Sequence, residues 1–248
     1  MSKKWLACLL AVVMAIITLP AAALAQEDSG VTVYINGSSG RDTNDGLTSS
    51  APVQTMGKAL ELAGEGGTII IVGTVYIRED ITIENVTVKR GDNLTSAMFY
   101  IYEPYEVTVK NAVIDGSSEK TLSSGGYIFL LFDNTVLNIE EGADIGNNDV
   151  LAINVARATL NMSGGRLHDN TNGTNNNNHG AAIWAYDSEL NFTGGIIENN
   201  YSTDSGGALY AAEVCQVLID GTIFQNNIAN NQGGAIYIES DPNGACLQ

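Results

Sequence analysis

Short runs in which apolar and polar residues alternate, separated by glycine and asparagine, make up most of this chain. Three of these runs repeat one pattern at intervals of about 27 residues, at residues 160–170, 190–200 and 217–227. Each is followed by a second motif, His-Gly-Ala-Ala-Ile-Trp or Gly-Gly-Ala-(Leu/Ile)-Tyr, at residues 179–184, 206–210 and 233–237. A repeat of this size made of short strands and turns predicts a solenoid.

Alternation assigns the side chains of each run to two faces. Leu160 and Met162 point inward, and the polar residues beside them point outward. After a Gly-Gly or Gly-Thr bend, Leu167, Ile197 and Phe224 continue the interior, which gives three strands per coil. Consecutive coils then pair as parallel strands about 4.8 Å apart. A companion series of inward strands begins at Tyr100, Leu130, Ile153, Ile183, Leu209 and Ile236.

The repeats predict an all-β fold, a parallel β-helix of about seven coils over residues 76–248. Asparagine recurs where the third strand turns, which predicts an internal asparagine ladder rather than a cation site. These asparagines are Asn148, Asn170, Asn200 and Asn227.

Residues 26–75 are expected to form an N-terminal cap and first coil. Strands are predicted over 31–35 and 68–75, and a short helix over 55–63 would close this end of the solenoid. The polar loop that holds Asp42, Asn44 and Asp45 lacks EF-hand spacing, so we expect a structural turn rather than a calcium site. No metal or cofactor is predicted.

The first 25 residues have the pattern of a signal peptide. Lys3 and Lys4 precede an apolar run over 5–19, and Ala23-Leu-Ala25 predicts cleavage before Gln26. No second apolar run is long enough to span a bilayer. We therefore expect a secreted or cell-surface product without a transmembrane segment.

The predicted mature chain carries nine basic and 28 acidic residues, a net charge of −19. This charge disfavours nucleic acid, anionic lipid and acidic polysaccharides as partners, and favours neutral glycans or proteins. Cys215 and Cys246 would remain after cleavage, and their spacing leaves open whether they pair. The last coil, ending near Ile238, has no polar capping unit, so we expect end-to-end association there or a truncated chain.

The chain resembles the right-handed parallel β-helix superfamily of bacterial surface proteins and pectate-lyase-like enzymes. Asp42-Thr-Asn-Asp-Gly46 looks like the first-coil signature of its secreted members. Gly206-Gly-Ala-Leu209, Gly233-Gly-Ala-Ile236 and Phe224-Gln-Asn-Asn227 resemble the tetrapeptides of polymorphic outer-membrane adhesins. The resemblance implies a right-handed coil and an adhesin-like surface protein, but such motifs specify coils rather than a chemistry.

Residues for catalysis are sparse. No Asp-Asp pair exists, His179 lies in an asparagine-rich loop, and no acidic cluster is apparent around Lys110 or Arg166. His168 and Glu198 occupy equivalent positions in successive coils, about 5 Å apart, where a histidine beside a carboxylate could act as a general base. We favour the alternative, an exposed ion pair between coils.

An outward aromatic column is the strongest binding candidate. Trp184, Tyr210 and Tyr237 each follow an inward residue, so they are expected to face solvent and to stack as a three-ring ladder. Loops over 171–179, 201–205 and 228–232 would wall a shallow groove beside them. A neutral glycan or a protein partner could bind there, although such ladders also stabilise neighbouring strands.

The sequence thus favours a secreted or cell-surface β-helix repeat protein that is not an enzyme and binds glycans or host and surface proteins. The competing interpretation is a carbohydrate-active enzyme, either a polysaccharide lyase or a glycoside hydrolase. A purely structural surface spike is a third.

Overall fold

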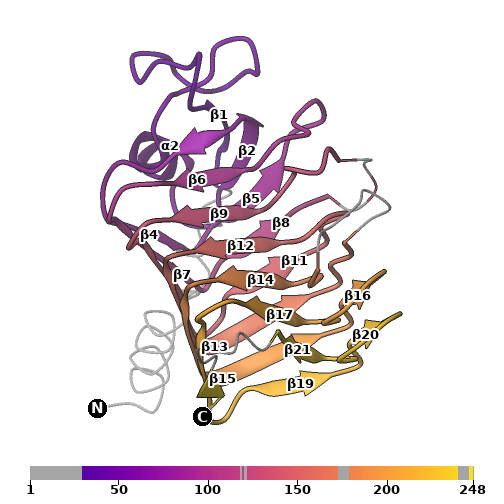
Figure 1. Cartoon of the computed structure of the whole chain (residues 1–248). Helices are drawn as coiled ribbons and strands as arrows, with labels where there is room; N and C mark the ends of the chain where they lie inside the picture. Colours follow the sequence, from indigo (N-terminus) through magenta and orange to yellow (C-terminus); the bar gives the residue numbers. More distant parts are fainter. Residues whose placement is uncertain (1–29, 118, 120–121, 173–178, 240–245, 248) are drawn as a thin grey trace, which may run out of the picture.

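A computed structural model describes residues 30–117, 119, 122–172, 179–239 and 246–247. The described chain is a parallel β-solenoid with one short helix (Figure 1). The predicted signal peptide and its cleavage site lie outside the described residues. No helix in the described part of the chain is long and apolar enough to cross a membrane.

Three strand positions repeat in each coil, as predicted. One position builds a seven-stranded sheet, from β3 (Val75–Tyr76) through β6 (Phe99–Ile101), β9 (Phe129–Phe132), β12 (Ile153–Ala156), β14 (Ile183–Tyr186) and β17 (Leu209–Ala212) to β21 (Ile236–Ile238). The other two positions build a 13-stranded sheet.

The strands of the 13-stranded sheet form two parallel stacks that are joined through the long strands β13 and β15. One stack contains β4 (Ile81–Glu84), β7 (Glu106–Lys110), β10 (Val136–Ile139), β18 (Gln216–Ile219) and β22 (Cys246–Leu247). The other contains β1 (Thr32–Asn36), β2 (Thr68–Gly73), β5 (Thr87–Arg90), β8 (Val113–Asp115), β11 (Asp144–Gly146) and β19 (Ile223–Gln225). The strands shared by both are β13 (Thr159–His168) and β15 (Glu189–Glu198).

Complete three-strand coils begin at β3, β6, β9, β12, β14 and β17. The described residues therefore form six complete coils with partial coils at each end, slightly fewer than the seven predicted. A further parallel pair, β16 (Tyr201–Ser202) and β20 (Ile228–Ala229), lies within the two later segments that were expected to be loops.

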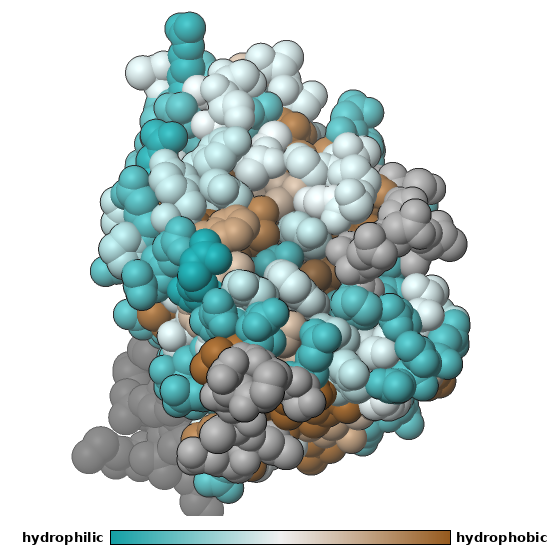
Figure 2. Space-filling model, in the orientation of Figure 1, coloured by the Kyte–Doolittle hydropathy of each residue, from teal (hydrophilic) through white to brown (hydrophobic). Residues whose placement is uncertain are grey.

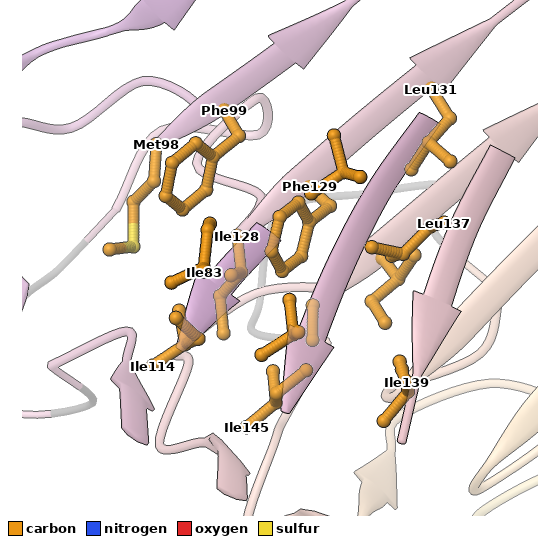
Figure 3. Packing of buried hydrophobic residues seen from close by; sticks show 14 of the residues in the cluster. Ile83, Met98, Phe99, Ile114, Ile128, Phe129, Leu131, Leu137, Ile139 and Ile145 are labelled. Atoms are coloured by element: carbon orange, nitrogen blue, oxygen red, sulfur yellow. The ribbon is translucent and has the colours of Figure 1, made fainter. Parts of the chain in front are cut away.

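Most of the predicted inward residues form the core. Leu160, Met162, Leu167 and Ile197 are fully buried, and Phe224 packs against the same cluster. Figure 3 shows apolar side chains of successive coils packed together, and the rings of Phe99 and Phe129 stack with centroids 4.8 Å apart. The buried cluster consists mostly of Ile, Val, Leu and Ala side chains, and their burial stabilises the solenoid.

One register prediction is wrong. Ile153 pairs with Phe129, and Phe129 pairs with Phe99, so Tyr100 and Leu130 lie one residue outside the inward column. The adjacent residues in Phe99-Tyr-Ile-Tyr102 and Phe129-Leu-Leu-Phe132 are all apolar or aromatic. Alternation cannot decide the face of such a strand, and a one-residue shift exchanges its two faces.

The asparagine ladder is present. The backbone N–H of Asn148 donates to Asn170 Oδ1 at 3.2 Å, and Asn170 Nδ2 donates to Asn200 Oδ1 at 2.9 Å. Asn200 Nδ2 continues the ladder to Asn227 Oδ1. The residue before each ladder asparagine has a positive φ, at Asn147, Asp169, Asn199 and Asn226, so the neighbour makes the turn and the ladder residue makes the hydrogen bonds.

At the N-terminal end, helix α2 (Met56–Ala63) buries Met56, Ala59 and Ala63 in the solenoid core. Asp42 accepts hydrogen bonds from the backbone N–H groups of Gln54 and Thr55 and from the Thr55 hydroxyl, at 2.7–2.9 Å. These hydrogen bonds give Asp42 a structural role in its loop. Burial opposes ionisation of Asp42, but these hydrogen bonds outweigh it and lower its pKa. That α2 caps the solenoid stays a prediction.

At the other end, the last coil exposes apolar residues. Ile223 and Ile228 are 53% and 58% exposed, and Figure 2 shows hydrophobic surface at this lower end. End-to-end association through this coil stays a prediction. Cys215 is buried and its thiol donates to the Ala212 carbonyl oxygen, whereas the side chain of Cys246 lies outside the described residues.

Candidate functional site

The outer face of the seven-stranded sheet gathers aromatic side chains. Strand pairing aligns one outward column, formed by Tyr76, Tyr100, Leu130, Asn154, Trp184, Tyr210 and Tyr237. Two residues further along the strands, Tyr102, Phe132 and Tyr186 lie on the same face. Six of the ten tyrosines in the chain therefore lie on this face, which is turned toward the viewer in Figures 1 and 2.

The aromatic rings form two clusters rather than one ladder. The upper cluster centres on Tyr100, whose ring lies 5.7 Å from Tyr76, 5.4 Å from Tyr102 and 5.7 Å from Phe132. Sequence reasoning missed this cluster because the register error placed Tyr100 inside the core. The sequence did contain a signal, since tyrosine hydroxyls in two alternate positions, Tyr100 and Tyr102, indicate an outward face.

The lower cluster contains the three predicted binding residues, but not as one stack. Tyr210 stacks on Tyr237 at 5.1 Å, as expected. Trp184 is in register with Tyr210, yet its ring stacks on Tyr186 of its own strand at 6.1 Å. The two pairs therefore lie side by side on neighbouring strands.

Tyr210 is less accessible than predicted. It is only 5% exposed, because His179 stacks on its ring at 4.2 Å and its hydroxyl donates to Glu239 Oε2 at 2.9 Å. Burial and this hydrogen bond both raise the pKa of Tyr210. His179 Nδ1 lies 2.8 Å from Asp204 Oδ2, a close approach that lacks hydrogen-bond geometry. Trp184 and Tyr237 are half-buried and offer the open surface of this cluster.

The weak catalytic candidates lie elsewhere, on β13 and β15. His168 and Glu198 are aligned, as predicted, but they have different partners. His168 is 6% exposed and lies between Asp144 and Asp169, with Nδ1 2.6 Å from Asp169 Oδ2 and Nε2 hydrogen-bonded to Asp144 Oδ1.

Glu198 pairs instead with Arg166, whose Nε lies 2.5 Å from Glu198 Oε1. The hydrogen bonds from Arg166 and then Gln225 lower the pKa of Glu198. Arg166 also lies 4.0 Å from carboxylate oxygens of Asp144 and Asp169. The expectation that Arg166 lacks an acidic cluster is therefore wrong. Strand pairing places Arg166 beside Asp144, 22 residues earlier, and aligns His168 with Glu198, 30 residues later, so linear spacing does not show this cluster.

This charged cluster is satisfied internally. Each of its groups already has an oppositely charged or hydrogen-bonding partner, which favours a stabilising role for the cluster. In the described part of the chain, no group of three or more histidine, cysteine or acidic side chains is arranged to hold a metal ion.

Comparison with known families supports a repeat protein with cell-surface character. Residues 194–212 and 221–239 match the Chlamydia polymorphic membrane protein repeat. Each match begins in the second half of one coil and ends in the strand of the next coil that carries Tyr210 or Tyr237. No curated protein and no solved structure matches the chain significantly.

Proposed function

We propose that this protein is a non-enzymatic, adhesin-like β-helix protein of the cell surface, and that the outer face of its seven-stranded sheet binds neutral glycans. The observation that carries the proposal is the concentration of aromatic rings on this face. Eight of them lie there in two clusters, of which Trp184 is a half-buried member. Aromatic faces of this kind present flat apolar surface with polar hydroxyl edges, which suits sugar rings.

The repeat match and the charge support the same function. The matched segments include β17 and β21, which carry two of the ring positions. The formal net charge of −17 disfavours polyanionic ligands and leaves neutral chains as the favoured glycans. A protein partner that docks on the same rings is the second outcome to be tested.

Native affinity electrophoresis tests the proposal. The protein is run through gels cast with different neutral polysaccharides, and the gels are then stained for residual polymer. We expect retardation without clearing, and we expect Trp184→Ala to weaken binding by about tenfold, the effect of losing about 1.4 kcal/mol at an aromatic contact.

Tyr201→Ala is the matched control, because Tyr201 is a 39% exposed tyrosine on β16, outside the seven-stranded sheet. Equal retardation of the wild type and Trp184→Ala would contradict the glycan site. Free migration in every gel would favour a protein partner. A cleared track would instead favour the glycoside hydrolase or lyase alternative, and His168 and Glu198 would then be replaced first.

A further inference from the structure

A groove of about 930 Å³ lies on a different part of the solenoid, over β1, β2, β5 and β8. Strand pairing aligns Tyr34, Ile70, Lys89 and Asp115 across these four strands, and all four residues line the groove. Figure 1 shows the four strands at the indigo and magenta end of the molecule. The groove is thus separate from the aromatic clusters of the seven-stranded sheet.

The lining combines an apolar strip with polar groups. Tyr34, Ile70 and Val72 are half-buried and contribute the apolar part. Ser49, from the segment between β1 and α2, and Asn93, from the segment after β5, add neutral polar groups to the lining. A concave site of this size with an aromatic ring and a few polar groups is typical of sites for small ligands.

Lys89 and Asp115 have unused hydrogen-bonding capacity. They are direct partners on adjacent parallel strands, but Lys89 has no ion-pair or hydrogen-bond partner among the described residues. Asp115 uses Oδ1 to accept from the backbone N–H of Ser117. The equivalent pair of the other stack, Glu84 and Lys110, does form a salt bridge at 3.4 Å. An ammonium donor and a carboxylate acceptor side by side match neighbouring hydroxyl groups of a sugar ring.

Arg90, which is 3% exposed and lines the groove, joins several backbone segments through hydrogen bonds. Its guanidinium donates to the carbonyl oxygens of Gly116, Ser96 and Gly126, which belong to the segments after β8 and β5 and before β9. A preformed groove loses less conformational entropy when a ligand binds.

We propose that this groove binds a short neutral saccharide, with one sugar ring against Tyr34 and its hydroxyl groups hydrogen-bonded to Lys89 and Asp115. An anionic ligand is disfavoured because Asp92, Asp115 and Glu119 all line the groove, against Lys89 and the buried Arg90. The proposal is independent of glycan binding by the seven-stranded sheet.

Isothermal titration calorimetry with maltotriose, cellotriose and trigalacturonate tests this proposal. We expect a neutral trisaccharide to bind and trigalacturonate to bind more weakly. Lys89→Ala should weaken the neutral ligand at least about tenfold, and Tyr34→Ala should do the same. Lys89 is exposed, so its variant keeps the fold, and Lys110→Ala is the matched lysine control.

Absence of binding by both neutral trisaccharides would overturn the proposal, as would tighter binding of trigalacturonate. Unchanged affinity in Lys89→Ala with reduced affinity in Trp184→Ala would also overturn it, and would assign the saccharide to the seven-stranded sheet. Reduced affinity in Lys89→Ala with unchanged affinity in Trp184→Ala would support saccharide binding in the groove, whether or not polysaccharides also bind the aromatic face.

Discussion

Arg90 carries a positive charge inside the solenoid, where a carboxylate would be the usual partner. Its described partners are carbonyl oxygens and the side chain of Asn148, whose Oδ1 lies 3.1 Å from Nη2. Burial lowers the pKa of Arg90 to about 10, which leaves it charged at neutral pH. The interaction is therefore a set of charge-assisted hydrogen bonds that ties three backbone segments together.

Replacement of Arg90 by methionine should strongly destabilise the protein. Several buried carbonyl oxygens would lose their donor, and we expect the free energy of unfolding to fall by about 3 kcal/mol or more. Urea unfolding followed by circular dichroism measures this change. The control is Arg157→Met, which removes a half-exposed pair with Asp133 and should cost less than about 1 kcal/mol. Equal losses in both variants would contradict the structural role of Arg90.

The sequence contained part of the information about Arg90. Val88 is an inward residue, so alternation along β5 also places Arg90 inward. Its partners come from positions 4 to 58 residues away in the sequence, and no local pattern identifies backbone carbonyl groups that converge on one point. The sequence therefore could not predict the hydrogen-bond partners of a side chain such as Arg90, which come from several coils.

At the scale of elements, two columns of asparagines run across the coils, and one coil contributes Asn170 to the first and Asn161 to the second. Asn170 is fully buried and both donates to and accepts from its neighbours in the ladder. Asn161 is half-buried on the outer face, where its Nδ2 donates to Asn138 Oδ1 and its Oδ1 accepts from Asn191 Nδ2. The hydrogen bonds are alike, but water can replace only those of Asn161.

We therefore expect Asn170→Ala to lower the free energy of unfolding by about 2 kcal/mol, and Asn161→Ala by less than about 1 kcal/mol. The midpoints of urea unfolding report both values. If Asn161→Ala destabilises the protein as much as Asn170→Ala does, burial does not determine the strength of these ladders.

Alternation predicted the strands well wherever polar and apolar residues strictly alternate, as in β13 and β15. It failed at β6 and β9, where both faces carry apolar or aromatic residues and only pairing with β12 fixes the register. The predicted Gly-Gly bends lie within the long strands β13 and β15. Gly165 and Gly195 have φ of +72° and +80°, and the chain passes through them with an irregular register while each long strand continues.

At the scale of the whole molecule, the solenoid separates its surfaces by chemistry. Aromatic rings gather on the seven-stranded sheet, the Arg166 cluster lies on β13 and β15, and the polar groove lies over β1, β2, β5 and β8. Repeat spacing predicted the coils. Because coil lengths vary, only the structure shows which residues of different coils lie next to one another. The aromatic face was predicted only in part, because the three expected rings form no single ladder and the cluster around Tyr100 was missed.

Hydroxyl-radical footprinting of aromatic side chains tests the central claim most directly, with and without the neutral polysaccharide that retards the protein most. If the outer face of the seven-stranded sheet binds the polymer, oxidation of Trp184, Tyr186 and Tyr100 should slow, while oxidation of Tyr201 on β16 should stay unchanged. Equal oxidation of Trp184 and Tyr100 with and without the polymer would contradict the proposed binding face.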